Sequence, residues 1–316
     1  MNTDRQHHPL SGIPPRRFAG SLSRHFRIFL ALLLLAFSVV CMTGCGAGSS
    51  GSGTENSGGA ASSAADRMDF VDVMGYHHQM TIDRAAGMND YLPGRFLHGD
   101  NGTLTYADSE NYTTRLGIDV SRYQGTVDWE KVKAQGYDFC FLRIGYRGYG
   151  AAGTLNEDPK FEENYAAASA AGFNVGVYFF AQAVNEEEAK EEADYVLQLL
   201  GKRKLQLPII YDPESITGDN ARTDGVSGEQ FTLNTLAFCK KIRKNGYEAG
   251  VYANMLWEAY QLDLPKLEGI PIWYADYEPQ PQTPYRFTWW QYTDEGHVDG
   301  VSGPVDLNIW MIPAGS

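Results

Sequence analysis

Cysteine is scarce in this sequence, and the spacings by which cysteine and histidine hold a metal are missing. The 316 residues include four cysteines, and neither a C-x-x-C nor an H-E-x-x-H pattern occurs, so we expect no metal ion and no cofactor. Cys140 lies in an expected strand and Cys239 in an expected helix. We predict that both are buried free thiols, with a single disulfide between them as the alternative.

Positive charge is also in short supply. The 26 Lys and Arg residues are outnumbered by 39 Asp and Glu residues, which gives a net charge of -13. Such a charge disfavours nucleic acid and other anionic polymers as partners. Aromatic residues, in contrast, are plentiful, with 19 Tyr, 6 Trp and 15 Phe. They are typical of a groove that stacks sugar rings, and equally of a large core, and the chain is long enough for one large domain with appendages.

A hydrophobic run long enough for a comfortable membrane span is absent as well. The nearly unbroken apolar run at 28–42 has the length of a signal-peptide h-region. It ends in M-T-G-C at Cys45, which resembles the lipobox of bacterial lipoproteins, where the cysteine is lipidated. We therefore predict a lipoprotein signal peptide at 1–45, with an uncleaved signal anchor as the alternative. Either way the domain is exported, and the lipidated form faces the cell wall from the outer face of the cytoplasmic membrane.

Two further segments precede the main domain. Residues 46–65 are rich in Gly, Ser and Ala, which predicts a flexible linker that spans about 25 Å on average and about 70 Å at full stretch. Residues 66–114 carry only short apolar stretches. We interpret them as an N-terminal strap of unknown role that packs on the main domain and does not fold independently.

From Arg115 onward, strand-like and helical patterns alternate. Five strand-like runs at 116–120, 139–144, 174–180, 207–211 and 249–252 are each followed by a helical pattern. Three more strands, at 271–275, 287–292 and 304–309, follow without full helices. Repeated β/α units imply a parallel sheet with right-handed crossovers. We therefore predict an α/β fold for 115–316, an irregular (β/α) barrel of about five β/α units followed by three strands.

In such barrels the active site lies at the carboxyl ends of the strands. That rule selects residues with acidic, polar or aromatic side chains, several of which are acids that would surround one opening. They are Asp119, Arg143, Tyr178, Phe180, Asp212, Glu214, Tyr252, Trp273, Asp276, Gln291 and Asp306.

The strongest local signal is a pair of carboxylates at the end of the apolar run 207–211. Because side chains alternate across a strand, Asp212 and Glu214 should project from one face, roughly 6–7 Å apart along the chain. Their repulsion would raise the pKa of one of them, which is one way to make a general acid that works near neutral pH. The alternative is a surface turn that carries two solvated acids.

The ordered set of motifs resembles the glycoside hydrolase family 25 lysozymes, also called Chalaropsis-type muramidases. Asp119 opens a D-x-S-x-x-Q-G motif, and Asp212 and Glu214 form the acidic pair. The resemblance extends over roughly 115–312, with Pro213 in place of the usual β-branched residue. The matching segments are 117–125, 141–150, 176–183, 212–214, 250–252, 273–277, 290–292 and 298–308.

The resemblance implies a role for each acid. Glu214 corresponds to the catalytic acid that protonates the glycosidic oxygen, and Asp119 and Asp306 correspond to acids that stabilise positive charge on the sugar. Asp212 would orient the N-acetyl group of the substrate. The 2-acetamido oxygen could attack the anomeric carbon, or a carboxylate could act directly; we favour substrate assistance. The expected substrate contacts are Tyr178, Phe180, Arg143, Tyr252, Trp273 and Gln291.

Each of these residues also has a purely structural interpretation. Asp119 could bond only to loop amides, and Asp306, close to Asn308, could belong to a turn. Asp276 could be a solvated loop acid, and Gln291 could satisfy buried groups. The aromatic residues could belong to the core.

The implied function is an exported, lipid-anchored muramidase that cleaves the β-1,4 bond between N-acetylmuramic acid and N-acetylglucosamine in peptidoglycan. We expect it to act as a monomer, without nucleic acid. A chitinase-like hydrolase is one alternative, although the D-x-x-D-x-D-x-E run of chitinases is missing around Asp212. A cell-wall binding module without catalysis is the other, and the retained Glu214 argues against it.

Overall fold

The computed structural model describes residues 66–92, 94–99, 101–216 and 220–315. The expected signal peptide, Cys45 and the linker at 46–65 lie outside these residues. Among the described residues, no helix combines the length and hydrophobicity that a membrane span requires.

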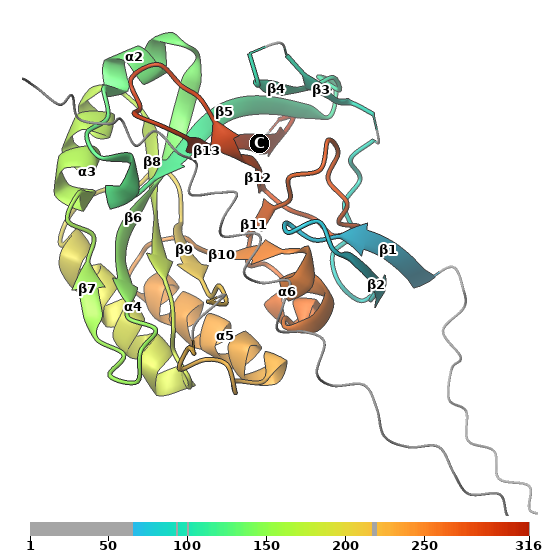
Figure 1. Ribbon diagram of the computed structural model, residues 1–316, viewed down its shortest axis with the longest axis vertical. Coiled ribbons are helices and arrows are strands. Elements are labelled where there is room, and N and C mark those ends of the chain that lie inside the picture. The colour runs from blue at the N-terminus through green and yellow to red at the C-terminus, as the bar shows by residue number, and fades with distance from the viewer. Residues whose placement is uncertain (1–65, 93, 100, 217–219, 316) are drawn as a thin grey trace, which may run out of the picture. The chain divides into compact units, whose positions relative to one another are not determined.

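Eight strands form a closed barrel (Figure 1). The sheet order runs β5, β13, β12, β11, β10, β9, β8, β6, and pairing of β5 with β6 closes the ring. The short β7 (Leu155–Glu157) pairs antiparallel with the last three residues of β6. The barrel strands are β5 (Tyr112–Val120), β6 (Tyr137–Arg147), β8 (Asn174–Phe180), β9 (Ile209–Asp212), β10 (Ala249–Asn254), β11 (Ile272–Ala275), β12 (Trp289–Gly296) and β13 (Val305–Pro313).

Strand direction confirms the predicted fold class. Neighbouring barrel strands from β5 to β12 are parallel. Strand β13 runs antiparallel to both β12 and β5. Helices follow each of the first five barrel strands and none separates the last three strands. These helices are α2 (Trp129–Ala134), α3 (Phe161–Ala170), α4 (Glu186–Leu200), α5 (Gly228–Lys244) and α6 (Met255–Tyr260), with the 3-10 helices η3 (Arg122–Gln124) and η4 (Leu264–Leu267).

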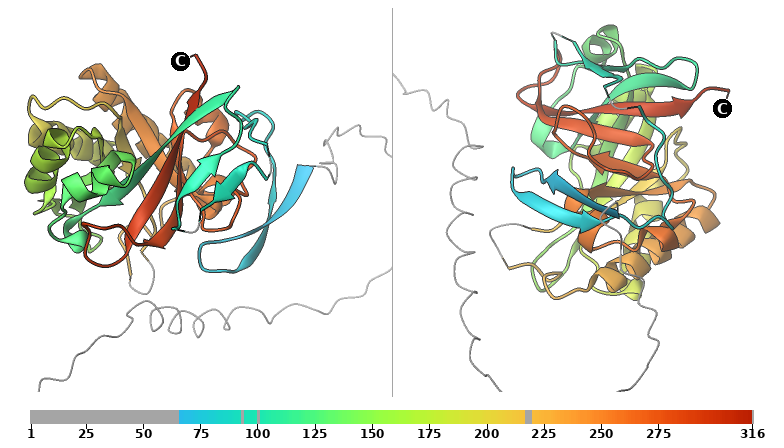
Figure 2. Two further views of the ribbon diagram at one scale, coloured as in Figure 1. Left: turned by 90° about the horizontal axis from the view of Figure 1, so that it is seen from above. Right: turned by 90° about the vertical axis from the view of Figure 1, so that its right-hand side faces the viewer.

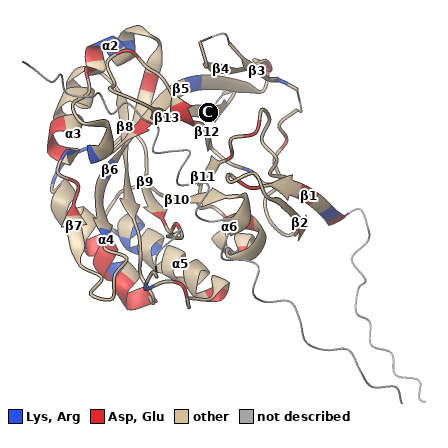
Figure 3. Ribbon diagram, viewed as in Figure 1, with Lys and Arg blue, Asp and Glu red and all other residues tan. Residues whose placement is uncertain are grey.

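Side-chain caps define where the two long helices begin. The Asn185 side chain accepts a hydrogen bond from the Glu188 backbone at the start of α4, and Ser227 accepts one from Gln230 at the start of α5. Three glutamates in the first turn of α4 face the positive end of the helix dipole. Figure 3 shows acidic residues along the outer helices, in keeping with the negative net charge.

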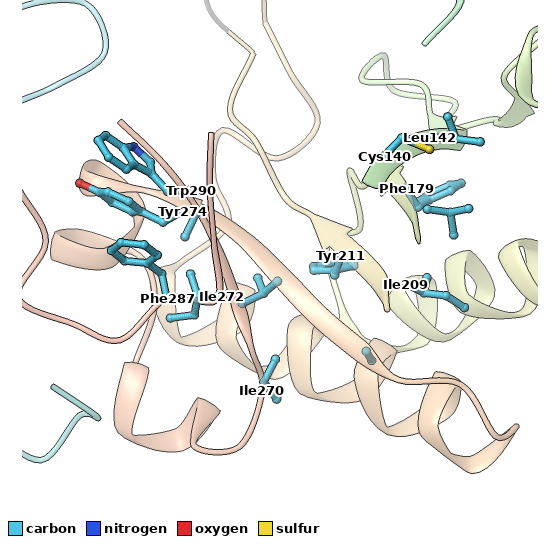
Figure 4. Packing of buried hydrophobic residues seen from close by; sticks show 14 of the residues in the cluster. Cys140, Leu142, Phe179, Ile209, Tyr211, Ile270, Ile272, Tyr274, Phe287 and Trp290 are labelled. Atoms are coloured by element: carbon cyan, nitrogen blue, oxygen red, sulfur yellow. The ribbon is translucent and has the colours of Figure 1, made fainter. Parts of the chain in front are cut away.

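Because side chains alternate between the two faces of each strand, the apolar side chains form two layers. One layer fills the barrel and includes Phe139, Phe141 and Trp273. The other lies between the strands and the helices, where Cys140 and Tyr211 pack (Figure 4). Gly176 faces inward, where a Cβ atom would lie 2.5 Å from the Phe141 ring, so close packing inside the barrel requires glycine at this position.

The two cysteines of the described domain are free and buried, as predicted. Cys140 lies on β6 and Cys239 on α5. Burial raises the pKa of both thiols, so neither is poised to act as a thiolate nucleophile.

The segment before the barrel consists of two hairpins. They are formed by β1 (Arg67–Val71) with β2 (His77–Thr81), and by β3 (Phe96–His98) with β4 (Leu104–Tyr106). Their buried residues join the main core. Figure 2 shows both hairpins on the side of the barrel away from α3 and α4. Strand β5 begins at Tyr112, inside the segment that the sequence analysis assigned to the strap.

The strap forms hydrogen bonds with the loop that follows β11. The Gln282 side chain donates to the Val71 carbonyl and accepts from the Val71 amide, at 2.8 Å in each case. The Asn89 side chain donates to the Thr283 carbonyl at 2.7 Å, and the Asn89 backbone N–H donates to the Pro284 carbonyl at 2.9 Å. The strap is therefore tied to a loop that starts at the barrel mouth.

Candidate active site

A single small pocket at the barrel mouth brings together most of the residues selected from the sequence. Its volume is about 210 Å³. All four acids proposed for catalysis line it, together with four of the six residues proposed to bind substrate. The lining residues are Asp119, Tyr178, Asp212, Glu214, Tyr252, Trp273, Tyr277, Gln291 and Asp306.

Strand direction explains why distant acids meet at this pocket. Asp119 is near the carboxyl end of β5, and Asp212 is the last residue of β9. Asp306 is near the start of β13, which runs antiparallel to β5, so this start lies at the same rim. Asp119 and Asp306 are direct partners across the two strands, a position in which the Cβ atoms lie about 5 Å apart. Asp306 is therefore a strand residue and not part of a turn.

Asp119 lies in a fixed hydrogen-bonding environment. Its Oδ2 atom accepts from Gln291 Nε2 at 2.9 Å and from Asn308 Nδ2 at 2.8 Å, and the residue is 3% exposed. Burial raises the pKa of Asp119 to about 6, opposed by hydrogen bonds from Asn308, Gln291 and Asp306. These donors, and not loop amides, hold the carboxylate in place.

Asp306 and Asp119 are hydrogen-bonded to each other. Two carboxyl groups can share a hydrogen bond only when one of them carries a proton. Burial and the negative charge of Asp119 raise the pKa of Asp306 well above its ordinary value. Asp306 is therefore the member that keeps the proton and donates it toward Asp119.

Glu214 is half-buried at the pocket. Burial, followed by the charge of Asp119, raises the pKa of Glu214 to about 7, and the neighbouring Tyr252 hydroxyl opposes this rise. Repulsion between Asp212 and Glu214 was predicted to raise the pKa of one of them, and it raises the pKa of Asp212. Burial is the larger cause for both groups, and the charged neighbour that raises the pKa of Glu214 is Asp119. At neutral pH, Glu214 can therefore hold a proton and give it up.

Asp212 is deeply buried, and its pKa is raised well above the ordinary value by burial and by Glu214 and Asp119. Its Oδ1 atom has no hydrogen-bond partner within the described part of the chain. A buried oxygen of this kind is costly unless a ligand or solvent satisfies it.

Gln291 links the acids to two tyrosines. Its Oε1 atom accepts from the Tyr252 hydroxyl at 2.9 Å and from the Tyr277 hydroxyl at 3.0 Å, while its Nε2 atom donates to Asp119. Because its oxygen is occupied by two donors, the amide nitrogen must face Asp119. Gln291 thus satisfies buried groups and lines the pocket at the same time.

Trp273 forms the floor of the pocket. It is 1% exposed, its ring stacks on Phe141 with centroids 4.6 Å apart, and its Nε1 atom donates to Asn308 Oδ1 at 2.7 Å. Tyr178 and Tyr252 contact the Trp273 ring edge-on. This aromatic cluster belongs to the barrel core and also supports the acids from below.

Three selected residues lie outside the pocket lining. Arg143 donates through Nε to Asp158 Oδ2 at 2.7 Å, and Phe180 pairs with Tyr146 at the end of β8. Asp276 is buried and accepts from the Tyr274 hydroxyl and from the Gln282 amide. The interpretation of Asp276 as a solvated loop acid is therefore wrong, because it anchors the loop that holds the strap.

Tyr277, Asn308 and Gln182 were not predicted as site residues from the sequence. Asn308 follows Asp306 by two residues on β13, so the strand period could have placed it on the same face. Tyr277 comes after the end of β11, where no period applies. The Gln182 side chain donates to the Glu214 carbonyl at 2.8 Å and accepts from the Thr223 hydroxyl at 2.9 Å. It therefore ties the segment carrying Glu214 to the end of β8.

Among the described residues, no group of three or more His, Cys, Asp or Glu side chains is arranged to hold a metal ion. The chemistry available at the pocket is that of carboxyl groups at different protonation states, together with tyrosine hydroxyls and an amide. Carboxyl pairs of this kind carry out acid–base chemistry at glycosidic bonds.

Sequence comparison finds curated relatives of this chain. Lysozyme M1 from Streptomyces globisporus is 29% identical over 221 residues, which cover 66% of this chain and 71% of that protein. The autolytic lysozyme from Clostridium acetobutylicum is 25% identical over 193 residues, which cover 61% of this chain and 54% of that protein.

Structural comparison and a family model agree with these relatives. The crystal structure of the bacterial lysozyme from Streptomyces coelicolor matches with a TM-score of 0.52 and 27% identity, and covers 62% of this chain and 91% of that one. The model of glycosyl hydrolases family 25 matches residues 118–301, more than half of the chain. The eight-stranded barrel with its acidic mouth therefore belongs to glycosyl hydrolases family 25.

Proposed function

We propose that this protein is an exported peptidoglycan muramidase that cleaves the β-1,4 bond between N-acetylmuramic acid and N-acetylglucosamine, with Glu214 as the general acid. The observation that carries the proposal is the convergence of Asp119, Asp212, Glu214 and Asp306 on one pocket of about 210 Å³. The lysozyme relatives and the family membership support the choice of substrate.

Glu214 is the group best suited to protonate the leaving oxygen. Its pKa of about 7 keeps a large fraction of the carboxyl group protonated at neutral pH. An acid is most effective when its pKa lies near the working pH. As the glycosidic bond breaks, the proton moves from the Glu214 carboxyl to the departing oxygen, and Glu214 becomes a carboxylate.

Asp119 and Asp306 form one unit that shares a proton and carries one negative charge. Positive charge develops on the sugar ring during bond cleavage, and a fixed negative charge stabilises it without rearranging. Gln291 and Asn308 hold Asp119 in one orientation. The pair therefore provides a preorganised counter-charge on the wall of the pocket.

Asp212 is assigned to the substrate's acetamido group. Its unpartnered Oδ1 atom is a free acceptor for an acetamido N–H. Orienting that group would let its carbonyl oxygen attack the anomeric carbon, so that configuration is retained without a protein nucleophile. Direct attack by a carboxylate is the other route, and trapping of a covalent glycosyl-enzyme by mass spectrometry would favour it.

The proposed substrate contacts divide into two groups. Tyr178, Tyr252, Trp273 and Gln291 line the pocket, where their rings and amide would meet the sugar that reacts. Arg143 and Phe180 lie beside it and would contact a neighbouring part of the substrate.

Two other functions are less well supported. A chitinase-like hydrolase would use the same acetamido chemistry but should carry a D-x-x-D-x-D-x-E run, which the Asp212 segment lacks. A wall-binding module would gain nothing from acids whose pKa values are raised by burial and by neighbouring acids.

Product analysis distinguishes the three functions. The full chain, purified in detergent, is incubated with purified peptidoglycan, and the new reducing ends are identified after borohydride reduction. Muramic acid ends support the proposed function. Glucosamine ends indicate the chitinase-type cut, and absence of new ends indicates a binding module.

We also propose that the enzyme is a lipoprotein anchored through Cys45 and acts as a monomer on the glycan strands of the wall. The apolar run and the M-T-G-C sequence support the anchor. Cys45→Ser should release the protein from the membrane fraction, as judged by fractionation and immunoblotting. Retention of Cys45→Ser in the membrane with unchanged processing would contradict lipidation at this residue.

A further inference from the structure

A cluster of two arginines and two tyrosines borders the catalytic pocket. We call Arg122, Tyr123, Arg143 and Tyr146 the Arg–Tyr cluster. Arg143 lies two residues after the inward-facing Phe141 and is the direct partner of Tyr178 across β6 and β8. The period of two therefore places Arg143 on the inner face, next to a residue that lines the pocket.

The other arginine reaches the cluster from the neighbouring strand. Arg122 and Tyr123 begin η3, three residues after Asp119 at the end of β5. Ser121 and Gln124 form a capping box at the N-terminal end of this short turn, where the Ser121 side chain accepts from the Tyr123 backbone amide and the Gln124 side chain accepts from the Ser121 backbone amide. The position of Arg122 is therefore set by the same strand that places Asp119 in the pocket.

The two guanidinium groups pack against the same two rings. The Arg122 Cζ atom lies 5.0 Å from the Tyr123 ring centre and 5.7 Å from that of Tyr146. The Arg143 Cζ atom lies 5.1 Å from the Tyr123 ring and 5.5 Å from the Tyr146 ring. Ring faces attract cations, so the tyrosines hold two like charges close together.

One arginine of the cluster is paired with a carboxylate, and the other has no carboxylate partner among the described residues. Asp158 is buried and accepts from Arg143 Nε and from the Arg122 backbone amide. Within the described residues, the Arg122 guanidinium forms no ion pair with a carboxylate, and Arg143 Nη2 has no hydrogen-bond partner. Asp158 thus pairs with the Arg143 guanidinium, and the Arg122 guanidinium keeps its positive charge in a protein whose net charge is -13.

The exposed part of the cluster combines a ring with this charge. Tyr123 is 72% exposed, and its hydroxyl accepts from Arg122 Nη2 at 3.2 Å. Exposed tyrosine rings are well suited to stack on sugars, and a guanidinium group recognises a carboxylate with two parallel hydrogen bonds. The cluster therefore has the chemistry to bind an acidic sugar.

We propose that the Arg–Tyr cluster is a carboxylate-binding subsite that holds the acidic substituent of a muramic acid residue beside the catalytic pocket. The inference rests on the proposed muramidase function and specifies how the substrate would be recognised. Arg122 would bind the carboxylate, and the Tyr123 ring would stack on the sugar that carries it. The carboxylate could belong to the lactyl group or to a stem peptide attached to it.

Binding measurements test the subsite. The full chain carrying Glu214→Gln, which binds without turnover, is titrated with two glycan fragments. One carries stem peptides, and the other has had them removed and presents free lactyl carboxylates. Each fragment is also prepared with its carboxylates converted to neutral amides. The second protein carries Arg122→Gln in addition, and Arg84→Gln, an exposed arginine of the strap, is the matched control.

The proposal predicts that the Glu214→Gln protein binds at least one acidic fragment roughly fivefold to tenfold more tightly than its amide form. Arg122→Gln should remove this preference, and Arg84→Gln should leave it intact. Raising the salt concentration should weaken the preference, because the site is partly exposed. The fragment that shows the preference identifies the source of the carboxylate.

Other results would overturn the proposal. Equal affinity for the acidic and amide forms would do so, and so would a preference that persists in the Arg122→Gln protein. Tyr123→Ala provides a second check, because loss of the ring should weaken binding of all four fragments. If the wild-type protein releases muramic acid ends while showing no carboxylate preference, the subsite fails and the proposed function stands. If it releases none, the proposed function fails.

Discussion

At the scale of single residues, the protonation states of Asp119 and Glu214 determine what the pocket can do. Their pKa values are about 6 and about 7. The proposed mechanism needs Asp119 ionised and Glu214 protonated. These two requirements overlap over a narrow range of pH.

The pH dependence of activity follows from these two groups. Above about pH 7, Glu214 loses its proton and can no longer act as an acid, so activity falls. Below about pH 6, the Asp119 carboxylate becomes protonated and the counter-charge is lost. We predict a bell-shaped profile of kcat/KM on solubilised glycan strands, with its maximum between these values.

A tyrosine variant checks which group sets each side of the profile. The Tyr252 hydroxyl lowers the pKa of Glu214, so Tyr252→Phe should move the alkaline side to higher pH. The acidic side should move less, because Tyr252 reaches Asp119 only through Gln291. A flat profile, or movement of the acidic side alone, would contradict the assignment.

The residues that line the pocket could be predicted from the sequence better than their hydrogen bonds and pKa values. The strand period and the barrel rule selected Asp119, Asp212, Glu214 and Asp306, and all four line the pocket. The hydrogen bond between Asp119 and Asp306 was not predicted, because it depends on the direction and register of β13. The order of residues alone does not show which carboxyl group becomes more deeply buried on folding.

At the scale of elements, the segment after β9 must hold Glu214 in place without a regular structure. Strand β9 ends at Asp212, and the Gln182 side chain from the end of β8 donates to the Glu214 carbonyl at 2.8 Å. The backbone N–H of Gln182 in turn donates to the Glu192 carboxylate, which is paired with Arg147. A network of hydrogen bonds and one ion pair therefore holds the backbone of Glu214 in place.

We predict that Gln182→Ala lowers kcat by about tenfold while changing KM little, because it loosens the catalytic acid more than the substrate contacts. The pH profile should shift as well, since Glu214 would be better hydrated. Gln79→Ala, an exposed glutamine on β2, is the matched control. An unchanged kcat with an unchanged profile would show that Gln182 does not position Glu214.

A buried glutamate on α6 links the barrel to the loop that holds the strap. Glu258 accepts a hydrogen bond from the Thr283 hydroxyl, and burial raises the pKa of Glu258 to about 8. The folded state therefore keeps this proton at pH values where the unfolded chain, with an ordinary pKa of 4.5, has released it. Stability from this group is complete below about pH 4.5 and declines as the pH rises to about 8.

We predict that Glu258→Gln raises the free energy of unfolding at pH 9 by at most about 5 kcal/mol. Glutamine resembles the protonated side chain, so the variant and the wild type should unfold alike near pH 4. Urea unfolding at the two pH values measures the difference. Equal stability of both proteins at pH 9 would contradict the raised pKa.

The sequence predicted the elements well where the period was clear. Five strand–helix units and three final strands are present, and the strands lie close to their expected positions. The antiparallel course of β13 was not predicted, because the periodicity of a strand is the same in both directions. Closure of the barrel selects the direction, and closure is a property of the whole sheet.

At the scale of the whole molecule, the two hairpins of the strap contribute to the core of the barrel domain. Phe70, Phe96, Leu104 and Tyr106 are buried together with residues of the barrel. Packing of the strap on the main domain was predicted from the sequence, but its hairpins were not, because their strands are only three to five residues long. Their stability comes from packing on the barrel and not from the hairpins themselves.

We predict that a protein lacking residues 1–111 unfolds at a temperature at least about 10 °C lower than one lacking residues 1–65, or aggregates during purification. Removal of the strap exposes apolar surface and leaves the loop at 279–285 without its hydrogen-bond partners. Thermal unfolding followed by circular dichroism compares the two proteins. Equal unfolding temperatures would show that the strap does not support the domain.

The central claim is that Glu214 donates the proton that releases the leaving sugar. Its most direct test is the turnover of Glu214→Gln, which keeps the size of the side chain and removes the acid. We predict that kcat on peptidoglycan falls by about a hundredfold to ten-thousandfold while the thermal unfolding curve is unchanged. A Glu214→Gln protein that clears cell walls at the wild-type rate would contradict the account.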